Sequence, residues 1–233
     1  MFSDYQLPIF SCFFLFIAML GYWISLAFPK NNTSFTVSRI TTLISNLLFG
    51  LTLIIRWWNE GYFPLSNLYE SLIFLSWGIS TIHLFVEFKT QSRLIGAISA
   101  PIIFFISGFS SLTLPIEMQK ALPLVPSLQS NWLMMHVSMM MISYSTLIIG
   151  SLFSILYLAF SLFKKEEKRY SVTSTSNEPS LIESTSFSQM SLLQTVDIWS
   201  YRIIGLGFPF LTLGIISGAV WANEAWGSYW SWD

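Results

Sequence analysis

The sequence contains one cysteine, two histidines and few charged residues, and each shortage excludes a class of protein. Cys12 is the only cysteine among 233 residues, so an internal disulfide, a dithiol pair and a cysteine-rich metal site are excluded. The histidines, His83 and His136, are too few for a multi-histidine metal site in one copy of the chain. Charged residues make up 10%, against about a quarter in an ordinary soluble domain. A net charge of −1 gives no indication of nucleic-acid binding.

The chain is instead rich in long apolar runs. Hydrophobic residues make up 53% of it, and its mean hydropathy is +0.61. About 20 apolar residues cross the hydrocarbon core as a helix, because lipid offers backbone polar groups no other partner. We predict an all-α fold, a polytopic transmembrane helical bundle in one membrane domain. The first span has no basic segment before it, so we interpret it as retained and not as a signal peptide. The predicted spans are 8–28, 40–58, 68–86, 94–114, 132–163 and 199–221.

The distribution of lysine and arginine predicts the orientation of these spans. Loops 29–39, 87–93 and 164–198 carry most of the basic residues, which the positive-inside rule places on the cytoplasmic or equivalent organellar side. Loop 57–67, loop 115–131 and the C-terminal segment then face outward. We expect loop 164–198, with its Ser- and Thr-rich centre, to be a flexible linker. We expect loop 115–131, apolar but broken by prolines, to lie along the outer membrane surface, with a short re-entrant segment as the alternative.

The segment 221–233 concentrates tryptophan at the outer end of the last span. An aromatic belt accounts for one or two tryptophans at a helix end, but not for four in such a short stretch. An amphipathic surface helix fits poorly too, because Gly227 weakens a helix there. We interpret the segment as a shaped surface for a large flat ligand, with a membrane anchor as the alternative. Its tryptophans are Trp221, Trp226, Trp230 and Trp232, and Asp233 follows them.

His136 is predicted to lie at the same depth as this segment. The run 132–163 would extend roughly 48 Å as a helix at ~1.5 Å per residue, which exceeds a core of about 30 Å. Because Lys164 marks its inner end, His136 projects beyond the outer boundary of the core. A neutral imidazole there is a suitable axial ligand for haem iron, whereas the methionines around it more often serve packing. We interpret His83, near an inner helix end, as a satisfied polar residue.

Two further features receive structural interpretations. Glu70, at the outer start of the span 68–86, is predicted to form an ion pair with Arg56 rather than to act as a functional carboxyl. The pattern Gly214-x-x-x-Gly218 in the last span permits close approach of a neighbouring helix.

Three motifs carry a resemblance to a known family. The sequence W-G-S-Y-W-S-W-D at 226–233 is similar to the tryptophan-rich signature of haem-handling membrane proteins. The motifs N-W-L-M-M-H-V-S-M-M at 131–140 and P-L-S-N-L-Y-E-S-L at 64–72 narrow the resemblance. Together they resemble the plastid cytochrome c biogenesis proteins of the system II haem-attachment pathway, over essentially the whole chain.

The resemblance implies a haem-presenting function at the chloroplast thylakoid membrane. Such proteins bind haem b transiently on the lumenal side and present it to apocytochromes, namely cytochrome f and soluble c-type cytochromes, whose C-x-x-C-H thiols react with the haem vinyl groups. It implies a ResB-type membrane partner in a haem-lyase or synthase complex, and leaves open whether this chain is itself an enzyme. It implies no catalytic residue, and His136 as the axial ligand of the iron. The cofactor-binding residues it implies are His136, Trp221, Trp226, Trp230, Trp232 and Asp233.

One departure and two alternatives accompany the resemblance. Family members continue past the W-S-W-D motif into further spans that supply more histidines, so we expect this chain to be a fragment or a truncated product. A small-molecule transporter is one alternative, but it would carry charges deep inside its spans, and these spans carry almost none. A structural subunit with an aromatic anchor is the other. Removing 221–233 separates the readings, because an anchor would lose membrane assembly and a haem site would lose haem.

Overall fold

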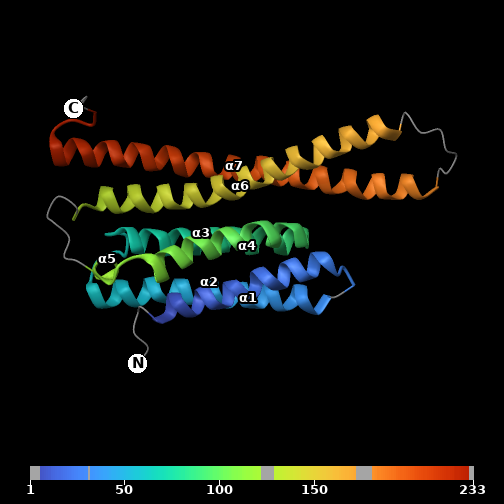
Figure 1. Ribbon diagram of the computed structural model, residues 1–233. Coiled ribbons are helices and arrows are strands. Elements are labelled where there is room, and N and C mark those ends of the chain that lie inside the picture. Colours follow the sequence, from blue (N-terminus) through green and yellow to red (C-terminus); the bar gives the residue numbers. More distant parts are fainter. Residues whose placement is uncertain (1–5, 31, 122–128, 172–179, 231–233) are drawn as a thin grey trace.

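The computed structural model describes residues 6–30, 32–121, 129–171 and 180–230, and the side chains of these residues outside 163–192. All regular secondary structure in these ranges is helical, and successive long helices run antiparallel (Figure 1). A π-helical turn, η1 (Phe109–Thr113), continues the fourth helix. The α-helices are α1 (Gln6–Ala27), α2 (Asn32–Glu60), α3 (Leu68–Thr90), α4 (Arg93–Gly108), α5 (Ile116–Gln119), α6 (Asn131–Ser171) and α7 (Ser180–Trp226).

Six helical segments in the described ranges are long and apolar enough to cross a membrane, which confirms the predicted all-α polytopic fold. The helices extend beyond several predicted spans. α2 begins at Asn32 rather than near 40, and α7 continues to Trp226. α6 and α7 also extend into the segment 164–198, which was predicted to be a flexible linker. The run K-K-E-E-K-R that directly follows the apolar residues of α6 consists of good helix formers, which explains why α6 does not end with those apolar residues.

The helix ends fall into two groups at opposite ends of the bundle (Figure 1). The end of α2, the starts of α3 and α6, the helix α5 and the end of α7 lie together at one of them. The tryptophans near these helix ends therefore share one end of the bundle, which we call the tryptophan end. Its tryptophans on described helices are Trp57, Trp58, Trp132, Trp221 and Trp226.

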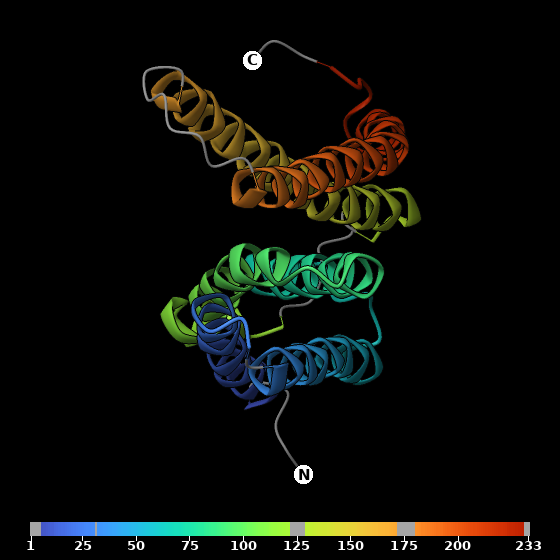
Figure 2. The ribbon, with the colours of Figure 1, turned by 90° about the vertical axis from the view of Figure 1, so that its right-hand side faces the viewer.

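The bundle consists of the four helices α1–α4 and the α6–α7 pair packed beside them (Figure 2). α6 and α7 contact each other along their length, and α3 is the main neighbour of α6 in the four-helix part. One core cluster joins the two parts, because Ile73 and Ile79 of α3 belong to the same cluster as Ile149 and Phe153 of α6. Burial of these side chains therefore fixes the position of α6 relative to α3.

Two ion pairs join α2 to α3, one fully buried and one with a partly exposed arginine. Arg56 Nε lies 3.5 Å from Glu70 Oε1 at the tryptophan end, which confirms the predicted pair. Arg39 Nε lies 3.6 Å from Glu87 Oε2 at the opposite end. Arg39 and Arg56 are 17 positions apart on α2, and Glu70 and Glu87 are 17 positions apart on α3. One antiparallel register of the two helices therefore produces both pairs. That separation corresponds to about 26 Å of helix, close to the hydrocarbon thickness of about 30 Å.

Candidate functional site

His136 lies in the second turn of α6 and faces α7. Its Nδ1 is 2.6 Å from the carbonyl oxygen of Gly214. A carbonyl oxygen can only accept a hydrogen bond, so Nδ1 carries the ring proton and donates it. In a neutral imidazole the lone pair is then on Nε2. This is the arrangement found in metal-binding histidines, whose second nitrogen usually donates to a carbonyl or a carboxylate.

Two glycines of α7 make room for the side chains of α6. A Cβ atom at Gly218 would lie 2.5 Å from His136 Nδ1 and 2.7 Å from its Cε1. A Cβ atom at Gly214 would lie 2.7 Å from the sulfur of Met140. We call Gly214 and Gly218 the glycine seat. The predicted close helix approach at Gly214-x-x-x-Gly218 is confirmed, and its purpose in this fold is to admit His136 and Met140.

The tryptophans of α7 follow the glycine seat toward the end of the helix. Trp221 comes three positions after Gly218, so it is about one turn further along α7. Its ring contacts that of Trp226 edge to face, with centroids 4.8 Å apart and an interplanar angle of 66°. The structure therefore brings these two predicted site residues together, and Trp226 remains 69% exposed. An exposed indole beside a helix end can stack against a flat ligand.

α7 ends directly after these tryptophans. Gly227 has φ of +78°, and its N–H donates to the carbonyl of Asn223 at 2.9 Å, which is a glycine C-cap. The cap explains why the helix does not continue to Trp230, whose ring is 65% exposed. The remaining predicted site residues, Trp232 and Asp233, lie outside the described residues.

These residues fit an iron porphyrin better than a bare metal ion. His136 offers one nitrogen donor of defined tautomer, and Trp226 offers an exposed aromatic surface at the same end of the bundle. Haem supplies four of the iron ligands itself, so one protein nitrogen on an axial side is a useful contribution. In the part of the chain that the structure describes, no group of three or more His, Cys, Asp or Glu side chains could hold a metal ion.

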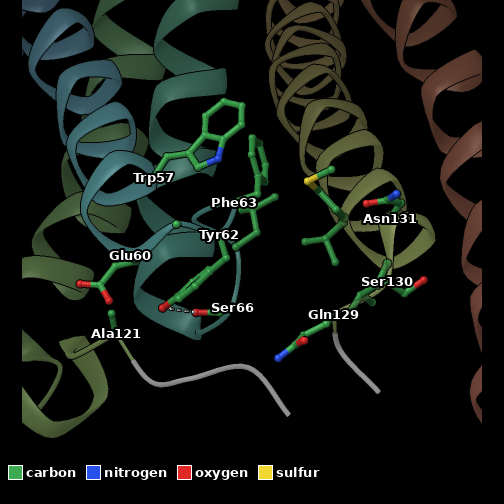
Figure 3. A pocket seen from close by; sticks show the side chains of 14 residues that line it. Trp57, Glu60, Tyr62, Phe63, Ser66, Ala121, Gln129, Ser130 and Asn131 are labelled. Atoms are coloured by element: carbon green, nitrogen blue, oxygen red, sulfur yellow. Dashed lines mark hydrogen bonds between the residues drawn. The ribbon is translucent and has the colours of Figure 1, made fainter. Parts of the chain in front are cut away.

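A cavity of about 930 Å³ also opens at the tryptophan end, between the end of α2 and the start of α6 (Figure 3). Trp57 and Phe63 line its apolar part, and Met134 of α6 lines the facing wall. The hydroxyl of Ser66 lies 3.5 Å from that of Tyr62 at its edge. Burial raises the pKa of the Tyr62 hydroxyl above its ordinary value, because water solvates the phenolate less well there.

His83 belongs to a separate cluster near the opposite end of the bundle. The hydroxyl of Ser99 lies 2.6 Å from its Nδ1, and that of Tyr22 lies 3.2 Å from its Nε2. Tyr22 also donates to Glu87 Oε2 at 3.0 Å. The interpretation of His83 as a satisfied polar residue is confirmed. Sequence reasoning missed the Tyr22–His83–Glu87 cluster; the signal was the spacing of His83 and Glu87 by one helical turn within an apolar span.

Comparison with known proteins gives concordant matches. A family model described as "Cytochrome C assembly protein" matches residues 65–233, which include His136 and the tryptophan-rich segment. The chain is 55% identical over 243 residues to the cytochrome c biogenesis protein CcsA of Porphyra purpurea, covering 94% of this chain and 75% of that protein. CcsA of Trieres chinensis is 53% identical over 233 residues, covering 94% of this chain and 75% of that protein. CcsA of Microcystis aeruginosa is 44% identical over 249 residues, covering 94% of this chain and 76% of that protein.

Proposed function

This chain belongs to the cytochrome c assembly protein family, and from that premise we propose that it acts at the haem-attachment step of c-type cytochrome biogenesis. In this proposal it binds haem b at the tryptophan end of the bundle and presents it to an apocytochrome. The reacting thiols belong to the apocytochrome's C-x-x-C-H motif, so the chain needs no cysteine nucleophile, in keeping with its single cysteine, Cys12.

The observation that carries the proposal is the state of His136. Its Nδ1 donates to the Gly214 carbonyl, so in the neutral imidazole Nε2 is the nitrogen with the lone pair that an iron ligand requires. The ring lies beside α7 about one turn before Trp221. A nitrogen donor and an aromatic surface therefore occur together at one end of the fold.

The proposal gives each group a separate role. His136 would hold the iron of a bound haem through Nε2. Trp221, Trp226 and Trp230 provide the aromatic surface against which the porphyrin stacks, together with Trp232 and Asp233 of the same segment. The iron porphyrin and the client thiols carry the chemistry, and the protein supplies binding and orientation.

The proposal also includes a location and partners. The membrane is the thylakoid membrane, with the tryptophan end on the lumenal side. Its support is the 55% identity to CcsA of Porphyra purpurea and the concentration of lysine and arginine in the loops at the opposite end. The proposed partners are a ResB-type membrane protein of the same complex and the apocytochromes, including cytochrome f.

An absorption spectrum tests the haem site. The chain is purified in mild detergent and titrated with hemin, beside His136→Ala and Met134→Ala variants. Met134 is the matched control, because it is an exposed soft donor on the same two turns of α6. We expect a Soret band in the wild type and in Met134→Ala, and its loss or shift in His136→Ala. An unchanged spectrum in His136→Ala would refute the ligand assignment, and no haem in any of the three would refute binding by this chain.

A further inference from the structure

We propose that the glycine seat positions the haem ligand: Gly214 and Gly218 of α7 hold the His136 ring so that Nε2, and not Nδ1, binds the iron. The inference rests on the proposed function. In addition to carrying tryptophans, α7 then determines which nitrogen of His136 faces the porphyrin. Neither glycine touches the iron in this account, so both are positioning residues.

Gly218 leaves space beside α7 that the His136 ring occupies. A Cβ at Gly218 would approach His136 Nδ1 to 2.5 Å, which is closer than side-chain contacts in proteins, and its Cγ to 3.1 Å, which is a tight contact. The ring is held near its backbone attachment, so it cannot yield without rotating away from α7. Any residue larger than glycine at 218 therefore removes the ring from its present position.

The hydrogen bond to the Gly214 carbonyl determines which ring nitrogen of His136 carries the proton. With the ring in place, Nδ1 lies 2.6 Å from the Gly214 carbonyl, and only the tautomer with a proton on Nδ1 makes this bond. A backbone carbonyl can only accept a hydrogen bond, because it does not gain or lose a proton. It therefore always favours the tautomer with the proton on Nδ1. The bond also increases the electron density of the ring, which strengthens the Nε2–iron bond and favours ferric iron.

Contacts between α6 and α7 far from His136 hold the two helices in one register. α6 and α7 interlock further along the same antiparallel register: a Cβ at Gly150 would lie 2.5 Å from Ile204 Cγ1, and the hydroxyls of Ser154 and Ser200 are 2.6 Å apart. α7 therefore cannot slide along α6 without breaking these contacts. The position of the glycine seat relative to His136 is set by the whole helix pair.

The test compares Gly218→Ala with Gly205→Ala, a control on the same helix where an added Cβ meets no atom within 4 Å. Each full chain is titrated with hemin, and the iron–histidine stretching frequency and midpoint potential of the bound haem are measured. We expect Gly218→Ala to bind hemin about 10- to 100-fold more weakly, as loss of a supporting partner of a metal ligand typically does. We also expect a lower stretching frequency and a higher potential. Gly205→Ala should match the wild type.

A second experiment avoids any folding defect of Gly218→Ala. In His136→Gly the ring is absent, and free imidazole can occupy its place and restore the haem spectrum. We expect imidazole to bind more weakly to His136→Gly/Gly218→Ala, since the new methyl group fills that space. We also expect 1-methylimidazole, which has no N–H to donate to the Gly214 carbonyl, to give a lower iron–nitrogen stretching frequency than imidazole in His136→Gly.

The outcomes separate the two proposals. If His136→Ala keeps the wild-type haem spectrum, the proposed ligand is wrong. If His136→Ala loses haem while Gly218→Ala behaves like Gly205→Ala, the ligand stands and the role of the glycine seat is refuted. Equal stretching frequencies with imidazole and 1-methylimidazole would overturn the tautomer selection by Gly214.

Discussion

Replacing Glu70 by glutamine should destabilise the bundle because it leaves a buried arginine without its counter-charge. Arg56 is 1% exposed and Glu70 is 0% exposed in the pair between α2 and α3. The carboxylate also accepts hydrogen bonds from the N–H and the hydroxyl of Ser66, both at 2.8 Å. Glutamine has nearly the same shape, so the change removes a charge without creating a cavity.

Removing one partner of a buried ion pair costs about 3–5 kcal/mol. Arg56 keeps two favourable contacts in the variant: it donates to the carbonyl of Gln119 at 2.6 Å and lies over the ring of Tyr69, 4.8 Å from the centroid. A cation over an aromatic ring is stabilised by about 0.5–2 kcal/mol. We therefore expect the lower part of the range, a loss of about 3 kcal/mol in the free energy of unfolding, which is more than 100-fold in the folding equilibrium.

The measurement is unfolding of the purified chain in mixed micelles with increasing SDS, followed by far-UV circular dichroism. Glu60→Gln is the matched control, because Glu60 is an exposed carboxylate at the end of α2 in the same region. Arg56→Met combined with Glu70→Met should recover most of the loss, since no unpaired charge remains. If Glu70→Gln unfolds at the same SDS fraction as Glu60→Gln, the ion pair does not stabilise the fold as argued.

Three further predictions concern other parts of the molecule. Gly96→Ala should lower the free energy of unfolding by about 1–3 kcal/mol in the same assay, because a Cβ there meets the ring of Tyr22, while Gly205→Ala should have little effect. Subtracting the spectrophotometric titration curve of Tyr62→Phe from that of the wild type should isolate the ionisation of Tyr62, with a pKa above the ordinary value for tyrosine. A difference curve centred at or below the ordinary pKa would contradict the burial argument. The contribution of this raised pKa to stability is fully present below the unfolded pKa of tyrosine and is lost as pH rises from that value through the folded pKa. A chain lacking 221–233 should still assemble in membranes but lose hemin binding; loss of assembly with retained hemin binding would favour an anchor.

The two ion pairs and the glycine seat stabilise different parts of the structure that positions the site. The pairs Arg56–Glu70 and Arg39–Glu87 join α2 and α3 toward the two ends of the bundle, and the core cluster around Ile79 then places α6 against α3. The position of His136 thus depends on contacts distant from it. Substitutions in these pairs should affect haem binding indirectly, through the placement of α6.

Much of the architecture could be predicted from residue type and spacing. Lipid leaves a helix as the one structure that satisfies the backbone of an apolar run, so the number of spans follows from composition and length. The grouping of Trp57, Trp132 and Trp221 at one end follows from the alternation of the spans. Helix ends were harder to predict, because 164–198 combines residues of good helix propensity with a Ser- and Thr-rich stretch.

The sequence by itself determined the class of the protein, the family and the place of His136 near the start of one helix, because these depend on composition, spacing and local motifs. Only the tertiary structure decided which partners these residues meet. Pairing of Asn46 Nδ2 with the Ser80 hydroxyl at 2.8 Å, in the register that also joins Arg56 to Glu70, requires two helices to be set against each other. The bond from His136 to the Gly214 carbonyl joins residues 78 positions apart. Such a contact depends on how α6 and α7 pack, and packing is a property of the whole bundle.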